Sequence, residues 1–385
     1  MTYSKKIARS IVAGLAALSV FAGISPVVQN DSFGMTVAQA AKSSDKNKSN
    51  RMNSESASIF PLVESEYQMT GLAVTETGRV FVSFPHWGAQ PADFSLAEVK
   101  DGALEPLLQD VKFASLRRLN YVMTANGPRL FALDEGRADA ADEAGRTPRV
   151  FSIDISGGEQ NVAAVYPITG DALAAGSLLS DIRVDTYTNN AFISDSGAAA
   201  ILVLDLGTGE CYRALEKAPE LRKNIQMIYF PSGVYNKLTD VCALELSEKH
   251  DMLYFSAMGG DIINSVPVKV LLNKSLAPEA RRKAIATETM HAAPCSGMVR
   301  RGTRLVMGDL PDEGIWEFDF QDEISKGELF NVGIDVKWAD SFAIDAVENL
   351  YFTETQNNYD FDRRDSYKLY KISWGKDGQQ RQAVH

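Results

Sequence analysis

Apolar and polar positions follow one pattern in six segments of the chain. Each segment has a short apolar strand, a polar turn, and a second apolar strand with a large apolar, mostly aromatic, residue near its middle. The segments are 70–84, 120–134, 181–195, 240–257, 295–309 and 340–354. Apolar runs of strand length separated by turn residues predict β-hairpins, so the pattern indicates a repeated β unit.

The second strands align on one central column. Its members are Phe81, Phe131, Phe192, Tyr254, Val306 and Tyr351. Neighbouring members lie 45 to 62 residues apart, which is the length of a four-stranded propeller blade with its loops. The spacing predicts an all-β fold, a six-bladed β-propeller over residues 59–377, with an ordinary β-sandwich as the alternative. The one helix expected, at 268–286, is divided by Pro278 because proline cannot continue a helix.

The N-terminus has the pattern of a secretory signal. Basic residues at Lys5, Lys6 and Arg9 precede an apolar stretch from 11 to 28, and Ala38-Gln39-Ala40 fits a cleavage site. We expect a cleaved signal peptide at 1–40, a disordered linker at 41–58 and a flexible tail at 378–385, with an uncleaved membrane anchor as the alternative. The mature protein is then secreted or periplasmic, with no membrane span.

The charge of the chain argues against nucleic acid as a partner. The net charge is −11, and removal of residues 1–40, which carry three positive charges and one negative charge, makes it −13. Binding to phosphates requires clustered Lys and Arg. A small-molecule ligand remains open, including a cation or an amine, and we expect a monomer.

Cysteine and histidine give no metal or disulfide signature. The three cysteines, Cys211, Cys242 and Cys295, are an odd number without a C-x-x-C motif, and the four histidines are scattered. His86 as a general base and a His291–Cys295 pair are weak candidates. Nucleophile elbows, phosphate loops and dinucleotide fingerprints do not occur in the sequence.

A polar column is expected at the channel, where the first strand of each blade begins. Counting back from the central column gives Thr70, Asn120, Asp181, Asp240, Cys295 and Asp340. Carboxylate and amide oxygens suit a hard cation such as calcium, and a ring of like charges favours a cation or an organic amine. The alternative is that these residues cap strand ends and hold channel water.

A second column follows the second strands and reads Phe84, Asp134, Asp195, Ala257, Asp309 and Glu354. An Asp in this place can accept hydrogen bonds from the backbone of a turn, so we interpret the column as mainly structural. Glu354 is kept as a ligand-binding candidate. Trp87 either lines the mouth of the channel or packs between blades.

Three stretches resemble the major royal jelly protein/yellow family. They are Phe84-Pro85-His86-Trp87 with Pro91 and Leu96, the blade at 181–210, and the blade at 238–273. His86 stands where the family usually has arginine, and the three cysteines do not match a secreted disulfide pattern of the insect members. The chain therefore looks like a microbial branch of the family. The resemblance implies a six-bladed propeller, and insect relatives bind biogenic amines in the channel or are linked to melanin chemistry.

The fold is also similar to the gluconolactonase/regucalcin group, which holds a divalent cation through Glu, Asn and Asp. By that resemblance Asn120, Asp181 and Asp240 would hold the cation, most plausibly calcium, although the first-blade Glu has no clear counterpart. Three functions follow as hypotheses. The first is an exported protein that binds a small polar or cationic molecule. The others are a metal-dependent lactonase or catechol-product isomerase, and a protein-interaction scaffold.

Overall fold

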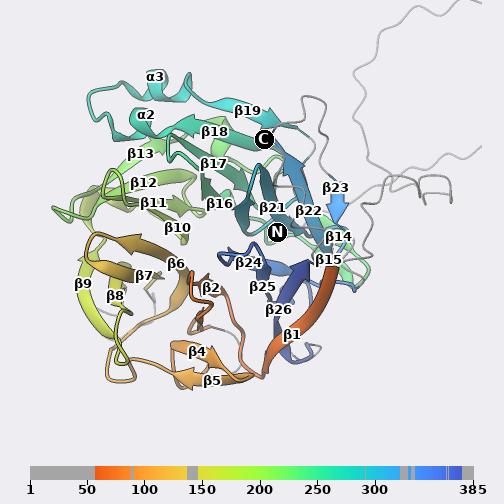
Figure 1. Ribbon diagram of the computed structural model, residues 1–385. Helices are drawn as coiled ribbons and strands as arrows, with labels where there is room; N and C mark the ends of the chain where they lie inside the picture. Colours follow the sequence, from red (N-terminus) through yellow and green to blue (C-terminus); the bar gives the residue numbers. More distant parts are fainter. Residues whose placement is uncertain are drawn as a thin grey trace, which may run out of the picture. The chain divides into compact units, whose positions relative to one another are not determined.

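The computed structural model of the protein describes residues 57–87, 91–136, 146–290, 292–320, 328–330, 334–360, 362 and 364–374. The predicted signal peptide and tail, most of the predicted linker, and His291 lie outside these residues. Within them, six four-stranded antiparallel sheets form the blades of a β-propeller (Figure 1). The predicted fold class is confirmed.

The first three blades follow the chain in order, each from its inner to its outer strand. They consist of β2 (Gly71–Val74), β3 (Val80–Ser83), β4 (Leu96–Lys100) and β5 (Ala103–Pro106); of β6 (Leu116–Thr124), β7 (Gly127–Asp134), β8 (Arg149–Asp154) and β9 (Asn161–Pro167); and of β10 (Leu179–Asp185), β11 (Asn190–Asp195), β12 (Ala200–Asp205) and β13 (Cys211–Glu216). The first two strands of each blade correspond to one predicted hairpin.

The fourth and fifth blades have the same order. They consist of β16 (Val241–Leu246), β17 (Met252–Ala257), β18 (Ile263–Pro267) and β19 (Ala286–Thr289), and of β20 (Met298–Arg301), β21 (Arg304–Asp309), β22 (Gly314–Asp319) and β23 (Glu328–Phe330). Inner strands of neighbouring blades contact each other around the ring, including β24 (Ala339–Ile344) of the sixth blade with β2 of the first. The ring is therefore closed.

The sixth blade joins the two ends of the propeller. Its strands β24, β25 (Leu350–Glu354) and β26 (Tyr367–Trp374) are completed by β1 (Ala57–Ser65), which pairs antiparallel with β26 as the outermost strand. Alternate residues of β1 point to opposite faces of the sheet, and Val63 is among those buried. The first strand of the propeller thus closes its last blade, a feature that the hairpin pattern does not predict.

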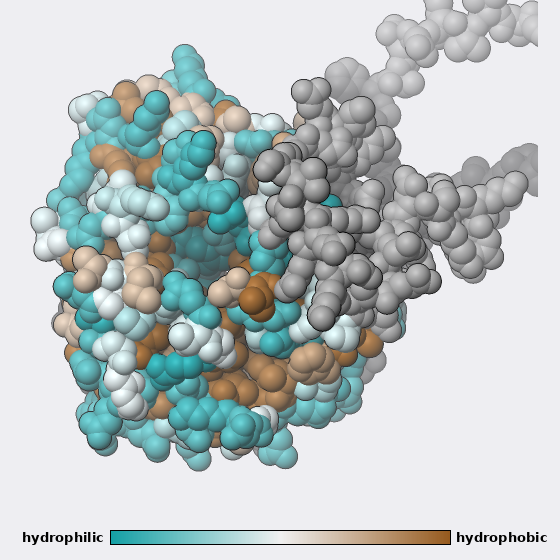
Figure 2. All heavy atoms as spheres, viewed as in Figure 1, coloured by the Kyte–Doolittle hydropathy of each residue, from teal (hydrophilic) through white to brown (hydrophobic). Residues whose placement is uncertain are grey.

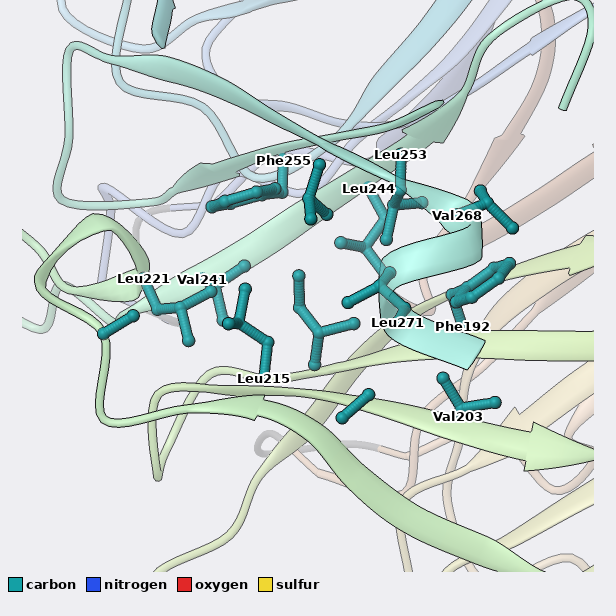
Figure 3. Close-up of a cluster of buried hydrophobic side chains, with 14 of the residues drawn as sticks. Phe192, Val203, Leu215, Leu221, Val241, Leu244, Leu253, Phe255, Val268 and Leu271 are labelled. Carbon is teal, nitrogen blue, oxygen red and sulfur yellow. The ribbon is translucent and has the colours of Figure 1, made fainter. Parts of the chain in front are cut away.

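The core consists of apolar clusters between adjacent blades. The cluster between the third and fourth blades contains Phe192, Leu215, Leu244 and Phe255 and is covered by Leu271 of helix α2 (Val268–Leu272) (Figure 3). A fully buried Leu or Phe side chain contributes about 1.5–3 kcal/mol. Inner strands such as β2 and β10 are buried along their whole length. The β2 sequence is accordingly a continuous apolar run, whereas β10 also buries charged residues.

Few helices interrupt the strands. Helix α3 (Pro278–Arg282) starts at Pro278, separate from α2, as the sequence predicts, and short 3-10 turns lie at η2 (Gly170–Ala172) and η3 (Pro219–Leu221). Nowhere in the described part of the chain is a helix long and apolar enough to span a membrane. A two-stranded hairpin, β14 (Ile228–Phe230) and β15 (Gly233–Tyr235), is inserted between the third and fourth blades.

Candidate ligand site at the propeller axis

Arg118 closes the axis of the propeller. It lies on β6 of the second blade with a 3% exposed side chain, and its guanidinium donates hydrogen bonds to carbonyl oxygens of four other blades. The acceptors are Thr70 at 2.8 Å, Ser296 at 3.0 Å, and Ser180 and Asp340 at 3.3 Å. A guanidinium can serve several acceptors because its five N–H groups point outward in one plane.

Two carboxylates compensate the charge of Arg118. Asp181 Oδ1 lies 3.6 Å from Arg118 Nε, and Asp340 Oδ2 lies 3.5 Å from Nη1. Asp181 also receives a hydrogen bond of 2.8 Å from Arg183, whose guanidinium pairs with Glu245 at 3.1 Å. The axis is thus filled by cations that the chain itself supplies.

Glycines allow the inner strands to approach one another at this level. A Cβ on Gly71 would collide with Ser83 Oγ and press on the backbone of Arg118, and a Cβ on Gly297 would collide with the carbonyl of Asp340. Both positions therefore require glycine for close backbone approach.

The three residues predicted to hold calcium are hydrogen-bonded elsewhere. Asn120 Oδ1 accepts from the backbone of Val184 at 2.8 Å, and so joins the second and third blades. Asp240 Oδ1 accepts from the backbone of Lys223 at 3.0 Å. Asp181 accepts at both oxygens, from Ile182 and Arg183 at Oδ1 and from Leu244 at Oδ2.

This donor set does not fit a divalent cation. Asp181 lies between two guanidinium groups, where a calcium ion would meet positive charge. Among the residues that the structure describes, no group of three or more His, Cys, Asp or Glu side chains could hold a metal ion.

Asp340 differs from the other carboxylates near the axis. It is 7% exposed, and within the described residues its carboxylate has the long ion pair with Arg118 and no hydrogen-bond donor. By contrast, Asp181 and Asp195 each accept several hydrogen bonds. A buried carboxylate normally has its acceptor capacity filled, so Asp340 has capacity for a further donor.

Arg117 lies beside Arg118 on β6 and pairs with Glu135. Its Nη1 lies 2.8 Å from Glu135 Oε2, while Trp87 Nε1 and Ser115 Oγ donate to the other oxygen of Glu135 at 2.7 and 2.9 Å. Burial lowers the pKa of Arg117, but the charges of Glu135, Cys242 and Asp340 raise it by more. The pKa of Arg117 is therefore raised overall. Arg117 and Asp340 hold equivalent positions near the start of the inner strands of the second and sixth blades.

The β14–β15 hairpin packs against Trp338, which directly precedes the inner strand of the sixth blade. Phe230 stacks on Trp338 with ring centroids 5.7 Å apart, and Tyr235 meets the same indole edge-on at 4.9 Å. Trp338 donates to Ser296 Oγ at 3.1 Å, directly next to a carbonyl that binds Arg118. We call Arg117 and Asp340 on the inner strands, together with Tyr235 of the hairpin, the axial mouth.

The remaining predicted residues serve as structural contacts in this arrangement. Thr70 donates its hydroxyl to the Arg117 carbonyl at 2.9 Å, and Cys295 is fully buried in an apolar cluster with Met298. Glu354 accepts from the backbone of Lys337 at 3.2 Å, and burial raises its pKa. Trp87 follows β3 and joins the first blade to the second through its hydrogen bond to Glu135. A ligand role for these four stays a prediction.

The true channel column differs from the predicted one because the hairpin turns have different lengths. The cross-strand partners of the central column are Ala73, Asn120, Arg183, Glu245, Val299 and Ala343. Three residues before these partners lie Thr70, Arg117, Ser180, Cys242, Ser296 and Asp340. The turn falls between Val74 and Val80 in the first blade but between Thr124 and Gly127 in the second. Counting back along the sequence therefore leads to Asn120, Asp181, Asp240 and Cys295 in place of Arg117, Ser180, Cys242 and Ser296.

Sequence reasoning missed Arg117, Arg118 and Tyr235. The arginines do leave a signal, because two charged residues interrupt the apolar start of an inner strand at 116–119. Charged residues are seldom buried unless paired. Tyr235 lies in an insertion outside the blade repeat, so no alignment of blades includes it.

The three cysteines are free thiols. Cys242 lies in the ring and its sulfur contacts the Ser296 carbonyl at 3.4 Å. Burial raises the pKa of Cys242 to about 11, although Arg117 and Arg118 oppose this. The thiol therefore stays protonated at neutral pH and is a poor nucleophile.

Known structures share the propeller but little sequence. A streptogramin B lyase is 8% identical, with 83% of this chain and 99% of that chain covered and a TM-score of 0.52. A gluconolactonase from Xanthomonas campestris is 13% identical, with 83% and 90% covered and a TM-score of 0.52. A luciferin-regenerating enzyme is 11% identical, with 82% and 95% covered and a TM-score of 0.52. Identities this low show a common fold and no common activity.

Comparison of the sequence with family models identifies the family of this chain. Comparison with curated proteins gives no significant match. The family model described as "Major royal jelly protein" matches residues 125–332, which is more than half of the chain and runs from β7 of the second blade to β23 of the fifth. The resemblance found in the sequence is thereby confirmed, and the chain belongs to the major royal jelly protein family.

Proposed function

We propose that this protein is an exported binding protein that takes a small polar or cationic molecule at the axial mouth. The observation that carries the proposal is Asp340, a buried carboxylate without a hydrogen-bond donor among the described residues. Leaving a buried charge without hydrogen bonds is costly. A ligand with an ammonium or another N–H or O–H donor would fill that capacity.

Arg118 determines how far such a ligand can enter. Its guanidinium is hydrogen-bonded to four carbonyls on the axis, so a ligand would bind above it and not pass through the channel. The hairpin above Trp338 would then form the roof of the site.

The alternative of a metal-dependent lactonase or isomerase has no comparable support in the residues. Its expected ligands Asn120, Asp181 and Asp240 are bonded to blade backbones and to Arg183. Export rests on the signal-like pattern of residues 1–40 and stays a prediction.

Calorimetric titration of the mature chain with a panel of primary amines tests the proposal. We expect at least one amine to bind, and we expect Asp340→Asn to weaken that binding about tenfold or more, because a hydrogen bond to a charged group is worth about 1.5–3 kcal/mol. The matched control is Asp205→Asn at the end of β12, where an Asn can still accept from the backbone of Gly207.

Native mass spectrometry with and without chelator complements the titration. An unchanged mass in chelator agrees with the proposal. A copurified divalent ion that chelator removes together with ligand binding would support the metal-dependent alternative. Absence of binding across the amine panel, or equal affinity for Asp340→Asn and the parent chain, would contradict the proposal.

A further inference from the structure

Arg117 has more hydrogen-bond donors than its neighbours use. Of its five N–H groups, the contacts within the described residues engage Nη1 with Glu135. The side chain is 16% exposed, so the guanidinium is largely enclosed and still reachable. A largely buried arginine with unused donors is suited to an anionic group, since its planar fork matches a carboxylate.

Glu135 compensates the positive charge of Arg117 only in part. Its two oxygens are shared with the indole of Trp87 and the hydroxyl of Ser115. The pKa of Arg117 is raised, so the group is fully cationic at any physiological pH. One carboxylate shared among three donors therefore leaves room for a second anion on the guanidinium.

Tyr235 adds a neutral donor at the axial mouth, where it packs against Trp338, two residues before Asp340. Its ring is held against Trp338, and its hydroxyl has no hydrogen-bond partner among the residues that the structure describes. Burial raises the pKa of Tyr235, although Arg117 and Arg364 lower it in part. The hydroxyl is therefore protonated and can donate to an anion.

From these contacts we infer that Arg117 and Tyr235 form an anion subsite beside Asp340, so that the molecule bound at the axial mouth is a zwitterion of the α-amino acid class. Arg117 and Tyr235 receive its carboxylate, and Asp340 receives its ammonium group. The inference rests on the proposed function and extends it, since a simple amine would use Asp340 alone. Because Tyr235 comes from the inserted hairpin, the insertion itself would select the ligand.

Three probes that share a phenylethyl group separate the two charges. Phenylalanine carries both, phenylethylamine carries only the ammonium, and 3-phenylpropanoate carries only the carboxylate. Titrated into the mature chain, phenylalanine is expected to bind at least about tenfold more tightly than either of the others.

Two variants then assign the carboxylate to its subsite. Arg117→Gln and Tyr235→Phe are each expected to weaken phenylalanine and 3-phenylpropanoate, by about tenfold and severalfold respectively, and to leave phenylethylamine within about twofold. Tyr235→Phe keeps the ring on Trp338 and so remains informative if Arg117→Gln destabilises the fold. Arg282→Gln removes an ion pair with Glu220 in helix α3, outside the axial mouth. It is the control and should leave the affinity for all three probes unchanged.

The outcomes distinguish the inference from the proposed function. If phenylethylamine binds as tightly as phenylalanine, and only Asp340→Asn weakens it, the anion subsite is wrong while the proposed function stands. If none of the three probes binds, the amino acid class is wrong, and the amine panel decides whether the proposed function fails with it.

Discussion

At the scale of single residues, three carboxylates occupy the same place at the end of a second strand and differ in their neighbours. Asp195 accepts from Ser177, Leu178 and Arg213, and although burial raises its pKa, these contacts lower it overall. Asp134 likewise accepts backbone N–H groups and Arg149. Both support the structural interpretation of the second column.

Asp309 lacks such compensation. Its carboxylate accepts one hydrogen bond, from the backbone of Asp312 at 3.2 Å. Burial, and secondly the charge of Asp312, raise the pKa of Asp309 from 3.8 to about 6. An acid with a raised pKa in the folded state favours folding only while it is protonated. Its contribution is complete below about pH 4 and is lost as the pH rises through about 6.

We therefore expect Asp309→Asn to stabilise the protein near pH 8, by at most about 3 kcal/mol for a shift of roughly two units. Near pH 4 the variant and the parent chain should have similar free energies of unfolding. Urea unfolding at the two pH values measures both quantities. Asp195→Asn is the matched control. Because the pKa of Asp195 is lowered in the folded protein, this substitution should decrease the free energy of unfolding near pH 8. A loss of stability for Asp309→Asn near pH 8 would refute this account.

At the scale of elements, the β14–β15 hairpin has two different faces. Ile228, Phe230 and Tyr235 point inward, where the cluster around Trp338 receives them, whereas Tyr229 is 69% exposed. At the tip, Ser232 Oγ accepts a hydrogen bond of 3.3 Å from Asn358, in the β25–β26 loop of the sixth blade. The hairpin is thus held mainly by apolar contact of one face.

Phe230→Ala should release the hairpin without unfolding the blades. Loss of a buried Phe costs about 3–5 kcal/mol, and the strands of this insertion belong to no blade, so we expect local opening and cleavage within 226–236. Limited proteolysis with mass analysis of the fragments measures this. Tyr229→Ala, which removes the exposed side chain of the preceding residue, is the control. Equal cleavage of both variants would show that the inner face does not hold the hairpin.

The elements also show which features were predictable. The six hairpins follow from local alternation, because each is a contiguous apolar–turn–apolar unit. The exact ring at the axis does not, because unequal turns and bulges such as the one between Leu179 and Asp181 shift the register without a visible change in pattern. The β14–β15 hairpin carries its own signal in Pro231-Ser232-Gly233 between apolar residues, but it falls outside the repeat.

At the scale of the whole molecule, the closing strand β1 depends on residues about 300 positions away. It pairs along Ala57–Ser65 with β26. Such long-range pairing leaves little trace in local sequence, since strand formation depends on the partner that is present. The sequence therefore indicated the number of blades and not how the ring is joined.

A chain that starts at Glu66 should lose several kcal/mol of stability, because it lacks the outer strand of the sixth blade and exposes the edge of β26. Thermal unfolding followed by circular dichroism measures the loss, and a rise in aggregation should accompany it. The control is a chain that starts at Ser49 and keeps β1. Equal melting temperatures for the two chains would mean that β1 does not close the ring.

The guanidinium of Arg118 has a consequence for how the ring assembles. Its acceptors come from the first, third, fifth and sixth blades, so a partly built ring leaves a buried cation short of partners and carbonyls without donors. Such intermediates are penalised. An open array of repeats can gain or lose units one at a time. Here the blades are bound to a common centre, and we expect folding to be a single cooperative event.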